Sequence, residues 1–170
     1  IDDKIVGYRA PAFSITNESY WALDIIKKAG LQYDASIFPI KGHDRYGLSN
    51  VKPEIFKLNN GLYEIPPATI KFLSKRWPIA GGGYFRLFPY WLTKNGIKKI
   101  NKNGRPAVVY LHPWEFDPEQ PKIKEANLVS KFRHYVNLDK TEKKFKRMLS
   151  DFQFTSIKDY LNIRKGESNE

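Results

Sequence analysis

One unbroken apolar run, residues 107–111 (AVVYL), constrains the fold more than any other feature of the sequence. Five apolar residues without polar alternation are typical of a strand that is buried on both faces. The run follows residues 89–102, where apolar side chains recur at helical spacing until Gly104 ends the pattern. A helix that leads into a doubly buried strand predicts an α/β protein, whose site is built by loops at the C-terminal ends of strands. His112 directly follows this strand.

The rest of the chain repeats the alternation of strands and helices. Before the run, the pattern predicts strands at 4–8 and 31–38, a helix at 17–29 with Asn17 as N-cap and Gly30 as its end, and a β-hairpin at 54–65. After it, the pattern predicts a proline-rich loop at 113–138, a helix opened by Asp139, a strand at 154–157 and a last helical turn or two at 158–163. We therefore expect one domain over residues 1–163 and a disordered tail at 164–170.

Composition excludes several classes of protein. With 41% hydrophobic and 28% charged residues, the chain is typical of a soluble globular domain. It has no cysteine, which excludes disulfides, thiolate zinc sites and a cysteine nucleophile. No membrane-spanning run or signal peptide is visible, so a cytoplasmic or a cell-envelope-associated location stays open. Because the first residue is Ile1, we expect the chain to have been cut from a longer protein.

The net charge of +11 favours a polyanionic neighbour, which could be an acidic glycan, an anionic membrane surface or a nucleic acid. No nucleic-acid-binding motif is present, so we expect no nucleic-acid partner. Lysines concentrate at 94–102 and 140–146, interleaved with apolar residues at helical spacing. We interpret both runs as solvated helix faces.

Four segments are dense in unlike functional side chains: residues 7–14 (GYRAPAFS), 43–47 (HDRYG), 81–86 (GGGYFR) and 111–118 (LHPWEFDP). His112 is a candidate general acid, because an imidazole exchanges a proton near neutral pH and can protonate a departing amine. The alternative is a structural histidine. Trp114 and its aromatic counterparts in 81–86 would either stack on sugar rings or pack in a core. For His43 we favour structural hydrogen bonding over metal ligation.

Together these motifs resemble the polysaccharide deacetylase superfamily, carbohydrate esterase family four, in its exopolysaccharide- and exosortase-associated branch. The resemblance covers residues 7–154 and implies an incomplete, distorted (β/α) barrel with an inserted β-hairpin. Arg9-x-Pro11 matches the family's third motif, whose arginine orients the catalytic aspartate. Leu111-His112 matches the fifth, whose histidine is the general acid, and Asp34 falls where the fourth is expected.

The resemblance implies that His112, Arg9 and Asp34 form the catalytic set. It also implies that residues 132–138 shape the substrate groove. The substrate-binding set would be Pro11, His43, Tyr84, Phe85, Arg86, Leu111, Trp114, Glu115, Arg133 and His134.

Two motifs of the resembled family do not occur in this sequence. One is Thr-Phe-Asp-Asp, which supplies the catalytic base and a metal-binding aspartate; the other supplies two metal-binding histidines. We therefore expect the full-length enzyme to use zinc or a similar divalent metal, and this chain to hold no metal and to be inactive alone. The expected partners are an N-acetylhexosamine glycan and the missing N-terminal half, with a homo-oligomer as a further option. The alternative is a non-catalytic carbohydrate-binding module that uses Trp114, Tyr84 and Arg86.

Overall fold

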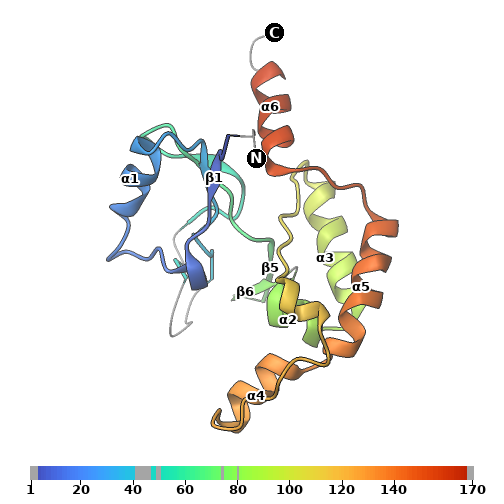
Figure 1. The fold of residues 1–170 in the computed structure, drawn as a ribbon. Helices are drawn as coiled ribbons and strands as arrows, with labels where there is room; N and C mark the ends of the chain where they lie inside the picture. The colour runs from blue at the N-terminus through green and yellow to red at the C-terminus, as the bar shows by residue number, and fades with distance from the viewer. Residues whose placement is uncertain (1–3, 41–46, 49–50, 74, 80, 168–170) are drawn as a thin grey trace.

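The computed structural model describes residues 4–40, 47–48, 51–73, 75–79 and 81–167. They form a mixed α/β structure with two groups of elements (Figure 1). One group is a small sheet with one helix beside it and the C-terminal helix also packed against it, and the other is mainly helical. The α/β class predicted from the sequence is confirmed.

The sheet has four short strands in the order β1-β2-β4-β3. They are β1 (Gly7–Tyr8), β2 (Tyr33–Asp34), β3 (Phe56–Lys57) and β4 (Tyr63–Glu64). β1 pairs with β2 and β2 with β4 in parallel, whereas β3 and β4 are antiparallel. Backbone hydrogen bonds from Gln32 N to Val6 O (2.7 Å) and from Ala35 N to Tyr8 O (2.9 Å) extend the first pairing by a residue at each end. The strands are much shorter than the predicted 4–8 and 31–38.

The predicted hairpin at 54–65 is confirmed. Leu58 N donates to Leu62 O at 2.8 Å, and Gly61 takes the positive φ of +83° that the turn requires. The hairpin is not an insertion, however, because β4 also pairs with β2 inside the sheet. Its second strand therefore continues the parallel arrangement.

The helix between β1 and β2 is α1 (Ala22–Lys28), which starts five residues later than predicted. Successive turns occupy the stretch before it, with Ala22 N donating to Ser19 O at 3.0 Å. Ser19 Oγ also donates to Ser14 O and accepts from Thr16 N, so this hydroxyl stabilises the turns in place of a helical start. Gly30 (φ +85°) follows the helix end as predicted.

The second group contains one hairpin and most of the helices. The hairpin strands are β5 (Thr69–Phe72) and β6 (Lys75–Pro78). Its helices are α2 (Gly82–Leu87), α3 (Tyr90–Lys102), α4 (Leu128–Tyr135) and α5 (Leu138–Asp151), with the short 3₁₀ turn η2 (Pro113–Phe116). The last helix, α6 (Ile157–Glu167), and the 3₁₀ turn η1 (Pro11–Phe13) pack on the sheet side instead, where Leu161 contacts the cluster of Ala35 and Ile65. None of the helices in the described ranges is both long and apolar enough to cross a membrane.

Several of these elements differ from the sequence predictions. α3 is confirmed, but β5, β6, α2 and α4 were not predicted, and the last two lie in segments interpreted as loops. Asn137 rather than Asp139 precedes α5, with a left-handed φ of +51°. No strand is present at 154–157, and α6 continues through residues 164–167, which we expected in the tail.

Two main apolar clusters form the core. One lies between α3, α5 and β5–β6 and includes Ile97, Phe85 and Met148; the other lies between the sheet and α1 and includes Leu23 and Ile37. The five side chains named here are each at most 2% exposed. The candidate site lies where the chain passes between the two groups.

Residues 107–111 make that passage. Ala107, Val109 and Leu111 pack against the helical cluster, while Val108 and Tyr110 pack against smaller clusters on the sheet side. The segment is extended but is not the doubly buried strand that we predicted, since all five residues are partly exposed. Its described pairing is limited to a parallel bridge between Tyr110 and Gly81 and a hydrogen bond from Ala68 N to Val108 O (2.9 Å).

Candidate functional site

A buried ion pair stands at the centre of the site. Arg86 on α2 is 2% exposed and Glu115 in η2 is fully buried, and Arg86 Nε donates to Glu115 Oε2 at 2.9 Å. The other oxygen, Oε1, accepts from the backbone N–H of His112 at 3.0 Å. Both oxygens of one carboxylate are thus used, and one of them fixes the backbone of the candidate general acid.

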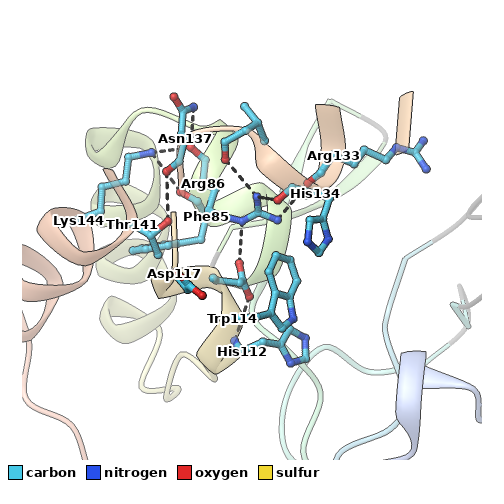
Figure 2. A network of polar contacts seen from close by, with 12 residues as sticks. Phe85, Arg86, His112, Trp114, Asp117, Arg133, His134, Asn137, Thr141 and Lys144 are labelled. Carbon is cyan, nitrogen blue, oxygen red and sulfur yellow. Dashed lines mark hydrogen bonds and ion pairs between the residues drawn. The ribbon is translucent and has the colours of Figure 1, made fainter. Parts of the chain in front are cut away.

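The rest of the Arg86 guanidinium binds the C-terminal end of α4. Nη1 donates to His134 O (2.7 Å) and Val136 O (3.1 Å), and Nη2 donates to Arg133 O (3.0 Å), as Figure 2 shows. The last carbonyls of a helix have no partner within it, so a buried cation at this end satisfies them and opposes the negative end of the dipole. Arg86 therefore joins α2, η2 and α4.

The C-terminal end of α2 is held by α5 in the same way. Lys144 Nζ donates to Phe85 O (3.2 Å), Arg86 O (2.8 Å) and Phe88 O (2.7 Å), and Asn137 Nδ2 also donates to Arg86 O (3.1 Å). Burial, and then the charge of Lys140, lowers the pKa of Lys144 from its ordinary value. Lys144 is thus an exception to the solvated face that we predicted for residues 140–146.

Three rings stack beside the ion pair. Trp114 and His134 are nearly parallel, with centroids 4.4 Å apart, and His112 lies on the same stack, 6.0 Å from Trp114. The Arg86 guanidinium is 5.0 Å from the centroid of Trp114. His134 is further held by a hydrogen bond between its Nε2 and Gln120 Oε1 at 2.7 Å. Since His112 is exposed whereas Trp114 and His134 are half-buried, the stack offers a solvent-facing imidazole on a fixed aromatic base.

Arg9 is connected to this stack through Tyr110. Its guanidinium carbon is 5.2 Å from the Tyr110 ring centroid, and the Tyr110 ring is 5.9 Å from that of His112. Arg9 Nε donates to Ala35 O at 3.0 Å. Burial lowers the pKa of Arg9 from its ordinary value, while Tyr110, Asp34 and Glu64 act in the opposite direction. Arg9 and His112, which come from two distant motifs, thus both lie beside the Tyr110 ring.

Asp34, whose charge acts on Arg9, is fully buried. Its two carboxylate oxygens accept from Ser36, Oδ1 from the hydroxyl (2.7 Å) and Oδ2 from the backbone N–H (2.9 Å). The carboxylate has no exposed surface through which to meet a substrate. Its position therefore suits a residue that supports Arg9 through charge, not one that reacts.

Glu64, beside Asp34 on the neighbouring strand, was missed by the sequence reasoning. The two residues are register partners of the parallel pair β2–β4, and both are fully buried. Burial raises the pKa of Glu64 to about 10, and the charge of Asp34 and a hydrogen bond to it act in the same direction. Glu64 Oε1 accepts from Ile37 N at 3.1 Å. A carboxyl group with this pKa is protonated at neutral pH and can donate its proton to Asp34.

The predicted substrate-binding residues fall into two groups. Arg86, Phe85 and Glu115 are buried, so these three side chains shape the site from beneath, contrary to our prediction of substrate contact; Leu111 packs against the helical core but is partly exposed. The members with exposed or half-exposed side chains are Pro11, Tyr84, Trp114, Arg133 and His134.

Three of the predicted residues need separate comment. The Arg133 side chain points away from the network in Figure 2 and contributes through its carbonyl instead. Tyr84 packs against Phe88, with centroids 5.8 Å apart. His43 lies outside the described residues.

The described ranges contain no group of three or more His, Cys, Asp or Glu side chains that could hold a metal ion. Within the described ranges, His112 has no pair of further ligands beside it. The Asp34 carboxylate accepts from Ser36, and Glu64 Oε1 accepts from Ile37 N while its Oε2 has no hydrogen-bond partner, but no third ligand accompanies these two carboxyl groups. The donor set in this part of the chain therefore does not fit a resident divalent metal.

A family model described as "Domain of unknown function (DUF3473)" matches residues 35–162. This range includes both ion-pair partners, the three stacked rings and Glu64, and it begins one residue after Asp34. Neither a curated protein nor a solved structure matches the chain. The match covers about three quarters of the sequence, and the chain belongs to the DUF3473 family.

Proposed function

We propose that this chain is the C-terminal portion of a metal-dependent polysaccharide deacetylase, which hydrolyses N-acetyl groups of a hexosamine-containing exopolysaccharide. The DUF3473 family is associated with polysaccharide deacetylase-like proteins, which supports the proposal. On this proposal, the parallel strands β1, β2 and β4 and the extended segment 107–111 belong to the family's distorted barrel.

The observation that carries the proposal is the setting of His112. Amide hydrolysis needs a proton delivered to the departing amine, and the donor must face the substrate while its backbone stays fixed. The His112 ring is exposed, and its backbone N–H is bonded at 3.0 Å to the buried Glu115. In this proposal His112 is the general acid, and Arg86 and Glu115 are positioning residues.

Arg9 has a supporting role in the proposal. Its cation is held beside Tyr110 by a backbone bond to Ala35 and by the charge of buried Asp34. Held in this way, it can orient an acidic group of the catalytic machinery or the acetyl oxygen of the substrate. Asp34 acts through Arg9 and does not touch substrate.

The proposed enzyme would use a divalent metal, zinc or similar, to activate water. Because the described residues do not offer the ligands, the proposal assigns the metal to residues outside this part of the protein, and this chain alone is expected to be inactive.

The test is release of acetate from N-acetylglucosamine oligomers in the presence of zinc or cobalt, by this chain and by its full-length gene product. We expect turnover only from the longer protein, and a loss in kcat of about 10²-fold or more in its His112→Gln variant. His134→Gln is the matched control, since it should raise KM with little change in kcat. Turnover by the chain alone would contradict the assignment of the metal site, and an active His112→Gln enzyme would contradict the general acid.

The alternative is a non-catalytic carbohydrate-binding module. The parallel Trp114–His134 pair favours it, because flat aromatic surfaces take up the apolar faces of sugar rings. This alternative predicts that the chain binds N-acetylglucosamine oligomers, that Trp114→Ala weakens binding, and that no form of the protein releases acetate.

A further inference from the structure

The helix α4 presents an apolar surface that no described part of the chain covers. Leu128 is 83% exposed, Val129 60% and Phe132 58%, and α4 has no buried residue. Figure 1 shows α4 at the lower edge of the molecule, away from the sheet and from α3 and α6. Three large apolar side chains on two helical turns are more than the scattered exposure that is normal on a protein surface.

The periodicity of α4 places these three residues on one face. At about 100° per residue, Leu128, Phe132 and Val129 fall within an arc of about 100°. His134, which packs on Trp114, lies nearly opposite to this arc. The helix thus uses its polar side to contact the protein and turns its apolar side to solvent, the reverse of an ordinary surface helix.

The loop before α4 extends the same surface. Tyr135 Oη accepts from Ile123 N (2.8 Å) and donates to Pro121 O (3.0 Å), and Lys131 Nζ donates to Lys124 O (2.8 Å). These bonds fix the loop along α4 and add Ile123, which is 53% exposed. We call the four apolar residues Ile123, Leu128, Val129 and Phe132 the α4 patch.

Basic residues surround the α4 patch. In the helix, Lys131 and Arg133 flank the apolar arc on its two sides, by the same 100° spacing. In the loop, Lys122 and Lys124 are exposed, and Glu125 is the single acidic residue between positions 121 and 135. An apolar face bordered on both sides by cations is the pattern of a helix that lies in a membrane interface.

We infer that the α4 patch docks the protein on an anionic lipid bilayer. The four apolar side chains enter the boundary between headgroups and acyl chains, while Lys122, Lys124, Lys131 and Arg133 contact lipid phosphates. A soluble acidic glycan or a nucleic acid would account for the cations but not for the apolar residues between them. The inference does not depend on the proposed deacetylase activity.

Docking in this orientation would place the candidate site close to the bilayer. The C-terminal end of α4 is bonded directly to Arg86, and His134 is part of the ring stack with His112. Because His134 lies nearly opposite to the α4 patch, α4 itself would stand between the ring stack and the bilayer.

The test is co-sedimentation of the chain with vesicles of phosphatidylcholine, with and without phosphatidylglycerol. We expect binding only to the anionic vesicles, weakened by added salt. Phe132→Asp should lower the partition coefficient about tenfold or more, since it removes a buried aromatic ring and adds a repelled charge. The matched control is Phe72→Asp at the β5–β6 hairpin, where the ring is 63% exposed. It should leave binding unchanged, and circular dichroism should confirm that both variants fold.

A second pair of variants tests the charges. Lys122→Gln combined with Lys124→Gln should weaken binding by about fivefold for each lysine. The exposed pair Lys98 and Lys99 on α3, changed in the same way, should have a much smaller effect. Equal binding to neutral vesicles, no binding at all, or loss with Phe72→Asp instead of Phe132→Asp would each overturn the inference. Binding to heparin that is insensitive to Phe132→Asp, without vesicle binding, would identify a soluble polyanion as the partner instead.

Discussion

Removing the negative charge of Glu115 should destabilise the protein strongly. In Glu115→Gln the side chain keeps its shape but has one acceptor oxygen where the carboxylate has two. The two donors it must meet, His112 N–H and Arg86 Nε–H, lie at 3.0 and 2.9 Å from different oxygens, so one of them would face the amide NH₂. Arg86, 2% exposed, would also lose its counter-charge.

Breaking a buried ion pair by removing one partner costs about 3–5 kcal/mol. For a domain whose total stability is about 5–15 kcal/mol, we expect the urea midpoint to fall by roughly 2 M. Tryptophan fluorescence reports the transition, because Trp114 stands 5.0 Å from the Arg86 guanidinium. The matched control is Glu142→Gln in the exposed pair with Lys146, which should leave the midpoint unchanged.

A double-mutant cycle separates the ion pair from other effects of substitution. Arg86→Met combined with Glu115→Leu removes both charges, so its cost should be smaller than the sum of the single costs by about 2 kcal/mol or more. Two results would refute the view that this pair holds η2 and α4 on α2. One is a loss of unfolding free energy below about 1 kcal/mol in Glu115→Gln, and the other is a double variant whose cost equals the sum of the two single costs.

Three further predictions concern stability. The folded state raises the pKa of Glu64 to about 10, so the folded protein retains a proton that the unfolded chain releases near pH 4.5. The free energy of unfolding should therefore fall as the pH rises above 4.5, by up to about 1.4 kcal/mol per pH unit. Urea unfolding at several pH values should show this slope, and Glu64→Gln should flatten it. Ala12 is exposed at φ +54°, so Ala12→Gly should stabilise by about 1 kcal/mol, and a lower melting temperature would contradict the strain. Met148→Ala in the helical core should cost about 2–5 kcal/mol in thermal unfolding, much more than Leu149→Ala on the exposed face of α5.

Elements with local signals could be predicted from the sequence. Gly30, Gly61 and Gly104 all take positive φ where we placed a helix end or a turn, and α3 begins one residue from its predicted start. The helix α2 could not be predicted, because it begins with two glycines and is preceded by a third, and glycine normally disfavours a helix. A Cβ on Gly81 would lie 2.3 Å from the Tyr110 ring, so glycine is needed for a tertiary contact that local patterns do not report.

Several of the predicted site residues lie in contact with one another, but these contacts could not be predicted from the sequence. His112, Trp114 and His134 do meet, although 22 positions separate the histidines. Arg86 and Glu115 pair beneath these rings although 29 positions separate them in the sequence. This pairing depends on tertiary packing, which composition and spacing do not encode. Glu64 carried a usable signal, since it is the acidic residue in an otherwise apolar strand segment, 62–65, with Leu62 and Ile65 both fully buried.

The alternating contacts of residues 107–111 determine the direction in which the His112 side chain points. Successive side chains of an extended segment face opposite ways, so a slip of one residue would carry Val108 and Tyr110 into the helical core and Leu111 out of it. The same slip would turn His112 away from Trp114. Substitutions that make the side chains on the two faces of the segment alike, such as Ala107→Val with Tyr110→Val, would therefore disorder the His112 imidazole. They would do so while Glu115, which accepts the hydrogen bond from the His112 backbone, stays unchanged.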